Sequence, residues 1–264
     1  IFKTKPHLVL THYTDFPATA TALQWDPERV WVDQTDDEYP RLQQMKSYGR
    51  IGEIYSGLRH ITVASPFLER SVKRSYPGVV THLCLNPLLE LDDLDEPKFE
   101  FRAQAPWLHI NPTAVKGIDF VLELAAALAD EKFLLVGNWG SRFPDRLPSN
   151  VKTIERQASL TQLLRSSKGL LMPSVWQEAF GRVPLEAMAN ALPVIASDRG
   201  ALPETVGQGG IVLPLDLELW KGAMRQTESF WKHQVIAGWK RFKAYQSEVK
   251  LAYAALRDEL SMLK

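Results

Sequence analysis

The feature of this sequence that most constrains its fold is a repeated alternation of short β-rich runs with helical stretches. The helical stretches carry apolar residues at helical spacing, most clearly over residues 117–129. Such alternation predicts βαβ units, in which helices connect parallel strands and cover the sheet. In sheets of this kind, ligands bind beyond the carboxyl ends of the strands. We expect strands at residues 7–10, 29–32, 60–63, 79–83, 107–110, 132–136, 151–154, 169–172, 193–196 and 210–213.

Composition and charge narrow the classes of partner. Lysine plus arginine and aspartate plus glutamate number 31 each, so no global positive field attracts nucleic acid, and we expect no such partner. No apolar run is long enough to cross a bilayer, so we expect no transmembrane segment. Peripheral membrane contact and a partner subunit both stay open. The single cysteine, Cys84, cannot form an internal disulfide, which favours a reducing compartment and a cytoplasmic location.

An acidic segment near the middle of the chain interrupts the alternation and indicates a domain boundary. We expect a first domain over residues 1–90, a linker over 91–105 and a second domain over 106–235. A terminal helix over 236–264 is expected to pack back toward the first domain. The carboxylates of Asp93 and Asp95 have a chemistry that suits a hard cation, but solvated linkers are commonly acidic as well, and we expect no metal site.

Residues 170–193 contain the candidate groups for binding a charged ligand. A strand is expected to end near Ser174, a loop follows, and Pro184 suits the first position of a helix. This places free backbone N–H groups of residues 181–183, and the positive end of a helix dipole, at the top of a parallel sheet, where a diphosphate can bind. Glu186 can accept two hydroxyl hydrogen bonds from a ribose, and Glu178 can lie on the sugar side. Taken singly, each glutamate also fits an ordinary solvated position.

The order of the motifs in this segment closely resembles glycosyltransferase family 4. Glu178 and Glu186 are separated by seven residues that include Phe180-Gly181, with Pro173-Ser174 before them and Leu-Pro-Val-Ile-Ala-Ser after them at 192–197. Matching stretches follow at 200–207 and 209–212, so that the resemblance covers 107–214. It implies an α/β protein of the GT-B fold, with two Rossmann-like parallel-sheet domains, and a retaining, metal-independent transfer reaction.

The resemblance also implies roles for individual residues. The residue matching Glu178 contacts the donor sugar near the reaction centre, and the residue matching Glu186 holds the ribose. The backbone that contacts sugar hydroxyls and phosphate corresponds to Phe180, Gly181, Arg182 and Val183.

A second motif precedes the expected helix at 117–129. Lys116 and Gly117 look like a lysine–glycine pair of the family, in which the cation would neutralise the departing diphosphate. Many relatives place an arginine six residues earlier, where this chain has Ile110. Arg182 or Arg199 are conjectural substitutes. An ordinary solvated lysine at a helix start is the alternative for Lys116.

The nucleoside is expected near the end of the next strand. Gly137 and Asn138 lie there in the family, and residues 153–156 would border the base. Trp139 fits stacking on a base or packing in the core equally well. The base itself is not readable from these residues, and the expected donor is a UDP- or GDP-linked sugar with no cofactor.

The first part of the chain resembles only the later part of an acceptor domain. Residues 6–12 look like a late strand of it, with His7 where aspartate is usual, and the opening βα units are absent. They are cut away, lie on another chain or are naturally missing. His12 would face the cleft and contact the donor sugar, and we name it with Glu178 as catalytic, although a structural role fits equally. His82 and His109 are expected to be structural.

The sequence therefore predicts a retaining glycosyltransferase that moves a sugar from a nucleotide diphosphate sugar to a hydroxyl-bearing acceptor. The alternative is a nucleotide-sugar-binding or assembly module that is catalytically incomplete. A sugar-nucleotide epimerase of the same fold is less favoured, because the matching motifs are those of the transferases.

Overall fold

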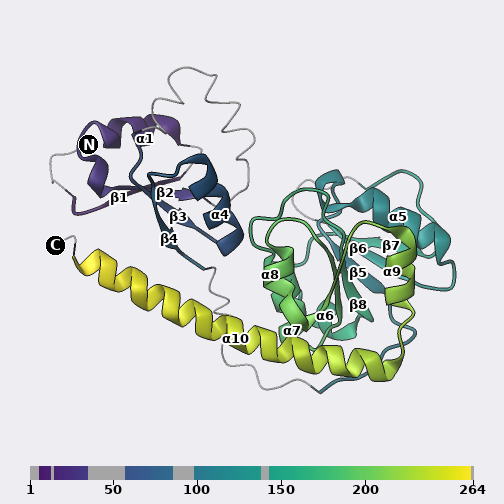
Figure 1. Ribbon diagram of the computed structural model, residues 1–264. Coiled ribbons are helices and arrows are strands. Elements are labelled where there is room, and N and C mark those ends of the chain that lie inside the picture. The colour runs from purple at the N-terminus through teal and green to yellow at the C-terminus, as the bar shows by residue number, and fades with distance from the viewer. Residues whose placement is uncertain (1–5, 13–14, 35–56, 86–97, 138–142, 263–264) are drawn as a thin grey trace. The chain divides into compact units, whose positions relative to one another are not determined.

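The computed structural model describes residues 6–12, 15–34, 57–85, 98–137 and 143–262, and the chain forms two compact units (Figure 1). Residues 1–87 and 247–264 form the first unit, and residues 88–246 form the second. Each unit is built around its own parallel sheet, so the predicted α/β class is confirmed. Most of the expected linker, residues 91–97, lies outside the described residues. Among the described residues, no helix has the length and apolarity that crossing a membrane requires.

The first unit contains a four-stranded sheet in the order β1-β2-β3-β4. Its connections include helix α1 (Phe16–Leu23), the short η1 (Pro27–Arg29) and helix α4 (Pro66–Ser75). The start of α4 follows from sequence: the Ser65 hydroxyl accepts from the Leu68 N–H at 3.1 Å, and Pro66 occupies the first turn. The strands are β1 (Val9–His12), β2 (Val30–Gln34), β3 (His60–Val63) and β4 (Val80–Leu83).

The last part of helix α10 (Glu228–Ser261) belongs to the first unit. The carboxylate of Glu259, on this helix, contacts Nδ1 of His82 on β4. The same histidine stacks on Trp31 with ring centroids 3.8 Å apart, and its Nε2 lies 3.0 Å from Nδ1 of His60. These contacts attach residues 247–261 to the sheet of the first unit.

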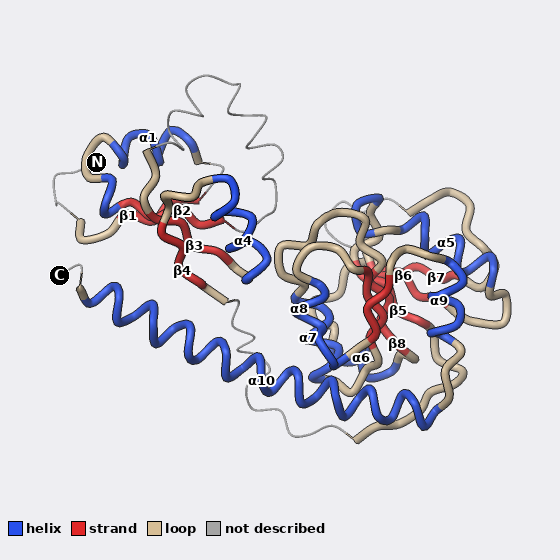
Figure 2. The backbone as a smooth tube through the Cα atoms, in the orientation of Figure 1, coloured by secondary structure: helices blue, strands red, loops and turns tan. Residues whose placement is uncertain are grey.

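The second unit contains a six-stranded sheet in the order β10-β9-β8-β5-β6-β7. Helices α5 (Ile118–Ala127) and α9 (Leu217–Met224) lie on one side of it, and α7 (Arg182–Ala189) and α8 (Leu202–Val206) lie on the other (Figure 2). The strands are β5 (Trp107–Ile110), β6 (Phe133–Val136), β7 (Val151–Ile154), β8 (Gly169–Met172), β9 (Val194–Ser197) and β10 (Ile211–Leu213). The remaining short elements are η3 (Ala114–Lys116), α6 (Thr161–Ser166) and η4 (Gly207–Gly209).

A buried tryptophan packs closely against the backbone of a neighbouring strand in the core of the second unit. The indole of Trp107 is fully buried and lies over Gly169 on the neighbouring strand β8. A Cβ at Gly169 would lie 2.2 Å from the ring, so this position excludes any side chain. Trp231 of α10 packs edge-on against Trp107, at 5.9 Å between centroids. Trp107 thereby packs strand β5 against both β8 and helix α10.

Candidate functional site

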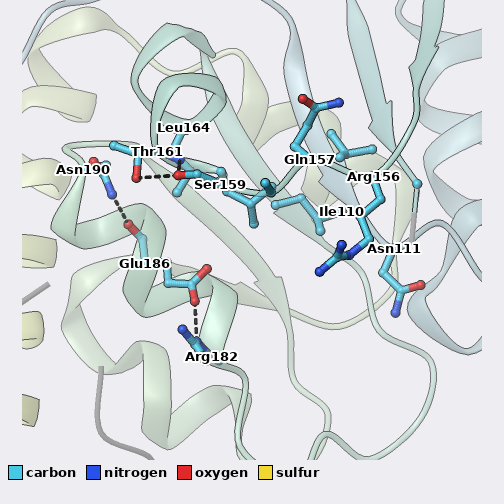
Figure 3. A pocket seen from close by; sticks show the side chains of 14 residues that line it. Ile110, Asn111, Arg156, Gln157, Ser159, Thr161, Leu164, Arg182, Glu186 and Asn190 are labelled. Carbon is cyan, nitrogen blue, oxygen red and sulfur yellow. Dashed lines mark hydrogen bonds and ion pairs between the residues drawn. The ribbon is translucent and has the colours of Figure 1, made fainter. Parts of the chain in front are cut away.

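Two cavities lie beside each other where strands β5, β6 and β8 end. The larger has a volume of about 350 Å³ and the smaller about 90 Å³, and both are lined by Ile110 and Asn111 at the end of β5. Figure 3 shows the larger cavity. Its remaining lining comprises Val136, Gly137, Arg156, Gln157, Ala158, Ser159, Leu160, Thr161, Leu164, Arg182, Glu186 and Asn190. The smaller one is further lined by His109, Lys116, Leu170, Leu171, Met172, Ser174 and Val183.

The first turn of helix α7 borders both cavities, since Arg182 lines the larger and Val183 the smaller. The helix begins at Arg182, two residues before the predicted start at Pro184, which is a correction. The reason is Gly181, whose φ of 89° lets the chain turn into the helix from the left-handed region. Pro184 falls at the third helical position, where the missing N–H costs no intrahelical bond. The N–H groups of residues 181–183 therefore lie at the start of the helix, where they have no intrahelical acceptor.

Lys116 and Glu178, predicted as separate functional residues, form one ion pair. The Lys116 ammonium donates to Oε1 of Glu178 at 2.6 Å, and the side chains are 20% and 5% exposed. The Ser174 hydroxyl donates to the same oxygen at 2.5 Å. Lys116 also lies 4.7 Å from the centre of the Trp176 ring, a cation–π contact. The carboxylate is thus buried together with its own counter-charge.

The loop that carries Glu178 is held from several sides. The Glu178 carbonyl accepts from the Ala201 N–H at 2.7 Å, and the side chain of Gln177 accepts from the Gly200 N–H at 2.6 Å. Gly200 has φ 62°, and a Cβ there would lie 2.2 Å from the Glu178 carbonyl oxygen. The two segments can approach this closely because residue 200 is glycine.

Gly117, next to Lys116 in the chain, likewise allows two segments to approach each other closely. Its φ is 82°, and a Cβ would lie 2.0 Å from the carbonyl oxygen of Pro173. The Val115 carbonyl also accepts from the Val175 N–H at 2.9 Å. Gly117 therefore fixes the Lys116 turn against the loop after β8, and it does not itself line either cavity.

A second ion pair lies at the wall of the larger cavity. Arg182 Nε donates to Oε1 of Glu186 at 2.5 Å, one helical turn along α7 (Figure 3). The Glu186 side chain is 15% exposed and that of Arg182 44%. Arg156, on the segment after β7, lines the same cavity from another side. This places a carboxylate and two guanidinium groups around one concave surface.

Other predicted site residues are placed as follows. Gly137 lines the larger cavity, and Asn138 and Trp139 lie outside the described residues. The side chain of Phe180 is buried against Tyr245, at 5.3 Å between ring centroids, and its carbonyl accepts from Thr205. His12 is exposed at the end of β1 in the first unit. Among the described residues, no group of three or more histidine, cysteine or acidic side chains has a metal-binding arrangement.

The two conjectured substitutes for the arginine replaced by Ile110 differ in position. Arg182 lines the larger cavity, whereas Arg199 lines neither and lies 3.5 Å from the carboxylate of Asp198. Ile110 itself contributes to the lining of both cavities. Arg156, which the sequence predicted as a border of the base, is a further cation of the larger cavity.

Sequence reasoning missed the position of His109, which lines the smaller cavity. It is 2% exposed, and Nδ1 lies 3.1 Å from the carbonyl oxygen of Leu171 on β8. Burial, with a smaller contribution from nearby Lys116, lowers its pKa to about 4 against the bond to Leu171. The imidazole is therefore neutral at pH 7. No residue in the described part of the chain hydrogen-bonds its Nε2.

Comparisons with known proteins show which family and which fold the chain resembles. Residues 109–227 match the family model described as Glycosyl transferases group 1. The chain is 41% identical over 63 residues to the MMP alpha-(1->4)-mannosyltransferase of Mycolicibacterium hassiacum, covering 22% of this chain and 15% of that protein. It is 31% identical over 128 residues to the alpha-1,3/1,6-mannosyltransferase ALG2 of Kluyveromyces lactis, covering 40% and 25%. The chain thus spans less than half the length of the curated relatives it matches.

Solved structures show the same fold. Sucrose-phosphate synthase from Thermosynechococcus elongatus has a TM-score of 0.78 at 19% identity, covering 99% of this chain and 75% of that one. Anabaena HepE in complex with UDP-glucose has a TM-score of 0.72 at 14% identity, covering 96% and 78%. Both the predicted GT-B fold and the resemblance to glycosyltransferase family 4 are confirmed. Residues 109–227 thus carry the similarity to the Glycosyl transferases group 1 family, and the chain has the GT-B fold.

Proposed function

We propose that the protein is a retaining, metal-independent glycosyltransferase that moves a hexose from a UDP- or GDP-linked donor to a hydroxyl-bearing acceptor. The observation that carries the proposal is the Lys116–Glu178 pair at the smaller cavity, next to the first turn of α7. A buried carboxylate and a cation are thereby held where a sugar–phosphate bond can be placed. The mannosyltransferase relatives and the UDP-glucose complex of HepE support a hexose donor.

The larger cavity suits the nucleoside and the smaller one the sugar end of the donor. Glu186 would accept hydroxyl hydrogen bonds from the ribose, and this would replace its bond with Arg182. Arg182, once released, would remain beside the phosphates. The N–H groups of residues 181–183 and the helix dipole would hold the diphosphate between the two cavities.

In the transfer step, the bond between the anomeric carbon and the donor phosphate breaks, and the acceptor oxygen bonds to the same face of that carbon. The electron pair leaves on the phosphate, and Lys116 offsets the charge that develops there. The departing phosphate takes the proton of the acceptor hydroxyl. Glu178 would orient the sugar and stabilise its positive charge without forming a bond to it, and we propose that His12 contacts the same sugar.

The test is transfer from a panel of UDP- and GDP-hexoses to mixed hydroxyl acceptors, with and without EDTA. We expect turnover with one donor class, unchanged by EDTA. Glu178→Gln and Glu186→Ala should each reduce it, and Glu218→Ala, an exposed position on α9, should not. Full activity of both site variants would refute the assignment, and loss of activity in EDTA would refute metal independence.

The rival is a nucleotide-sugar-binding or assembly module, favoured by the apolar side chain of Ile110 at both cavities. Binding raises the melting temperature for a ligand that prefers the folded state. A donor that stabilises the protein but is neither transferred nor hydrolysed, with all acceptors supplied, would establish the module. Such a module would act with a partner subunit or in peripheral contact with a membrane. The expected location for either function is the cytoplasm, since the one cysteine, Cys84, is a free thiol.

A further inference from the structure

His109 carries a buried hydrogen-bond acceptor, and the residue lines the smaller cavity. Its Nδ1 lies 3.1 Å from the Leu171 carbonyl oxygen, which can only accept, so Nδ1 must hold the proton. The ring is neutral at pH 7, because burial lowers its pKa to about 4. In a neutral imidazole protonated at Nδ1, Nε2 is an acceptor. The tautomer is therefore determined by the neighbouring strand.

Nε2 is buried, and no described residue donates to it. A buried polar atom without a partner costs roughly the hydrogen bond it fails to make, so such atoms in folded proteins mark water or ligand positions. His109 lines the smaller cavity together with Lys116 and Ser174. The cavity volume of about 90 Å³ is enough for several water-sized groups.

The chemistry of the cavity selects the group that can bind there. Phosphate oxygens at neutral pH are acceptors, so they would face the lone pair of Nε2 unfavourably. A hydroxyl group donates to Nε2 and can still accept a hydrogen bond from the Lys116 ammonium, which has three donors. Ile110 and Asn111 line both this cavity and the larger one, so a ligand in one cavity lies beside the other.

We propose that His109 accepts a hydrogen bond from a hydroxyl group of the bound nucleotide sugar and thereby contributes to donor recognition. This inference rests on the proposed function, because it takes a nucleotide sugar as the ligand. The hydroxyl belongs either to the transferred sugar or to the ribose, and the two sources give different results below.

Two substitutions separate the nitrogens of the ring. His109→Asn keeps an N–H near the position of Nδ1, where it can still donate to Leu171, and removes Nε2. His109→Gln places an amide oxygen near the position of Nε2 and gives up the bond to Leu171. The Kd values of UDP, UDP-glucose, GDP and GDP-mannose are measured for the wild type and both variants by calorimetry.

We expect His109→Asn to weaken binding of the nucleotide sugar by roughly fivefold, the factor for one neutral hydrogen bond, and His109→Gln to weaken it less. An unchanged Kd for the matching nucleoside diphosphate assigns the hydroxyl to the sugar, and an equal loss for both ligands assigns it to the ribose. If His109→Asn binds the nucleotide sugar like the wild type, the inference is overturned and the proposed function stands. If the wild type binds none of the four ligands, both fail.

A second measurement covers the case in which the variants do not fold. The ¹⁵N signal of Nε2 in the wild-type protein, observed in long-range ¹H–¹⁵N correlation spectra, reports whether the nitrogen accepts a hydrogen bond. We expect it to shift on addition of the nucleotide sugar that binds. An unchanged Nε2 signal at saturating ligand would overturn the inference.

Discussion

The ammonium of Lys116 and the carboxylate of Glu178 lie 2.6 Å apart although 62 residues separate them in the chain. Lys116 lies just before α5 and Glu178 in the loop after β8, so the two strands β5 and β8 bring them together. The buried Glu178 carboxylate therefore has a counter-charge within hydrogen-bond distance.

Removal of the cation alone should therefore destabilise the second unit. Lys116→Met leaves the Glu178 carboxylate buried without its counter-charge, and we expect a loss of about 3 kcal/mol in the free energy of unfolding. The double variant Lys116→Met/Glu178→Gln should recover most of this loss. Urea denaturation measures Lys116→Met, Glu178→Gln and the double variant, with Lys152→Met at an exposed position on β7 as the control. Additive effects of the two substitutions would show that the pair is not coupled.

Acid should destabilise the second unit through His109. The folded-state pKa is lowered from 6.5 to about 4, so the unfolded chain binds a proton over a range in which the folded chain does not. Stability is therefore lost as the pH falls through this window, by roughly 3 kcal/mol in total, and is regained as the pH rises. Unfolding free energies at pH 7 and pH 4.5 should differ less in His109→Asn than in the wild type. Equal pH slopes would contradict a neutral buried ring.

The glycines of the site should differ in their tolerance of a methyl group. Gly200→Ala brings a Cβ within 2.2 Å of backbone at Glu178, whereas Gly181→Ala meets the mobile end of Leu202 at 2.7 Å. Both positions have positive φ, and strain of about 1–3 kcal/mol is expected for each from the backbone alone. We expect Gly200→Ala to lower the melting temperature and the affinity for donor more strongly than Gly181→Ala.

Gly222→Ala serves as the matched control. This glycine lies in α9 with nothing within 4 Å of the added Cβ. Alanine there should stabilise the helix by about 0.5–1 kcal/mol. A smaller effect at Gly200 than at Gly181 would indicate that the loop carrying Glu178 can move to accept the side chain.

The contact between His82 and Glu259 should protect the end of α10. The Glu259 side chain is 44% exposed, so its replacement by glutamine is expected to cost about 1 kcal/mol. Hydrogen–deuterium exchange should rise over residues 247–261 and stay unchanged over 109–227. Asp258→Asn, on a neighbouring side chain that is 79% exposed, is the control. Equal exchange in the two variants would show that the contact does not hold the helix.

The sequence predicted the strands well because each is a short apolar run between polar segments. Gly169–Met172 and Trp107–Ile110 were predicted with the bounds that the structure has. The start of α7 was wrong by two residues, because the left-handed conformation of Gly181 begins the helix before the proline does. Local patterns of residue type do not contain that dihedral angle.

The site was predictable in its residues and less so in their contacts. Glu178, Glu186 and Lys116 stand out through motif spacing, and all three lie at or beside the two cavities. The position of His109 beside the smaller cavity was not predicted, because a histidine within a buried strand has no sequence signal that indicates which cavity it lines. The orientation of its ring depends on the hydrogen bond to the carbonyl of Leu171, which is 62 residues away in the chain.

The two residues that join β4 to α10 are synthesised at very different times. His82 and Glu259 are 177 residues apart, and the second unit lies between them in the chain. At ribosomal rates of about 5–20 residues per second, His82 is made roughly 9–35 seconds before its partner. During that interval the nascent first unit lacks the helical segment 247–261. The first unit, although its sheet is made early, is therefore completed only after the second unit has been synthesised.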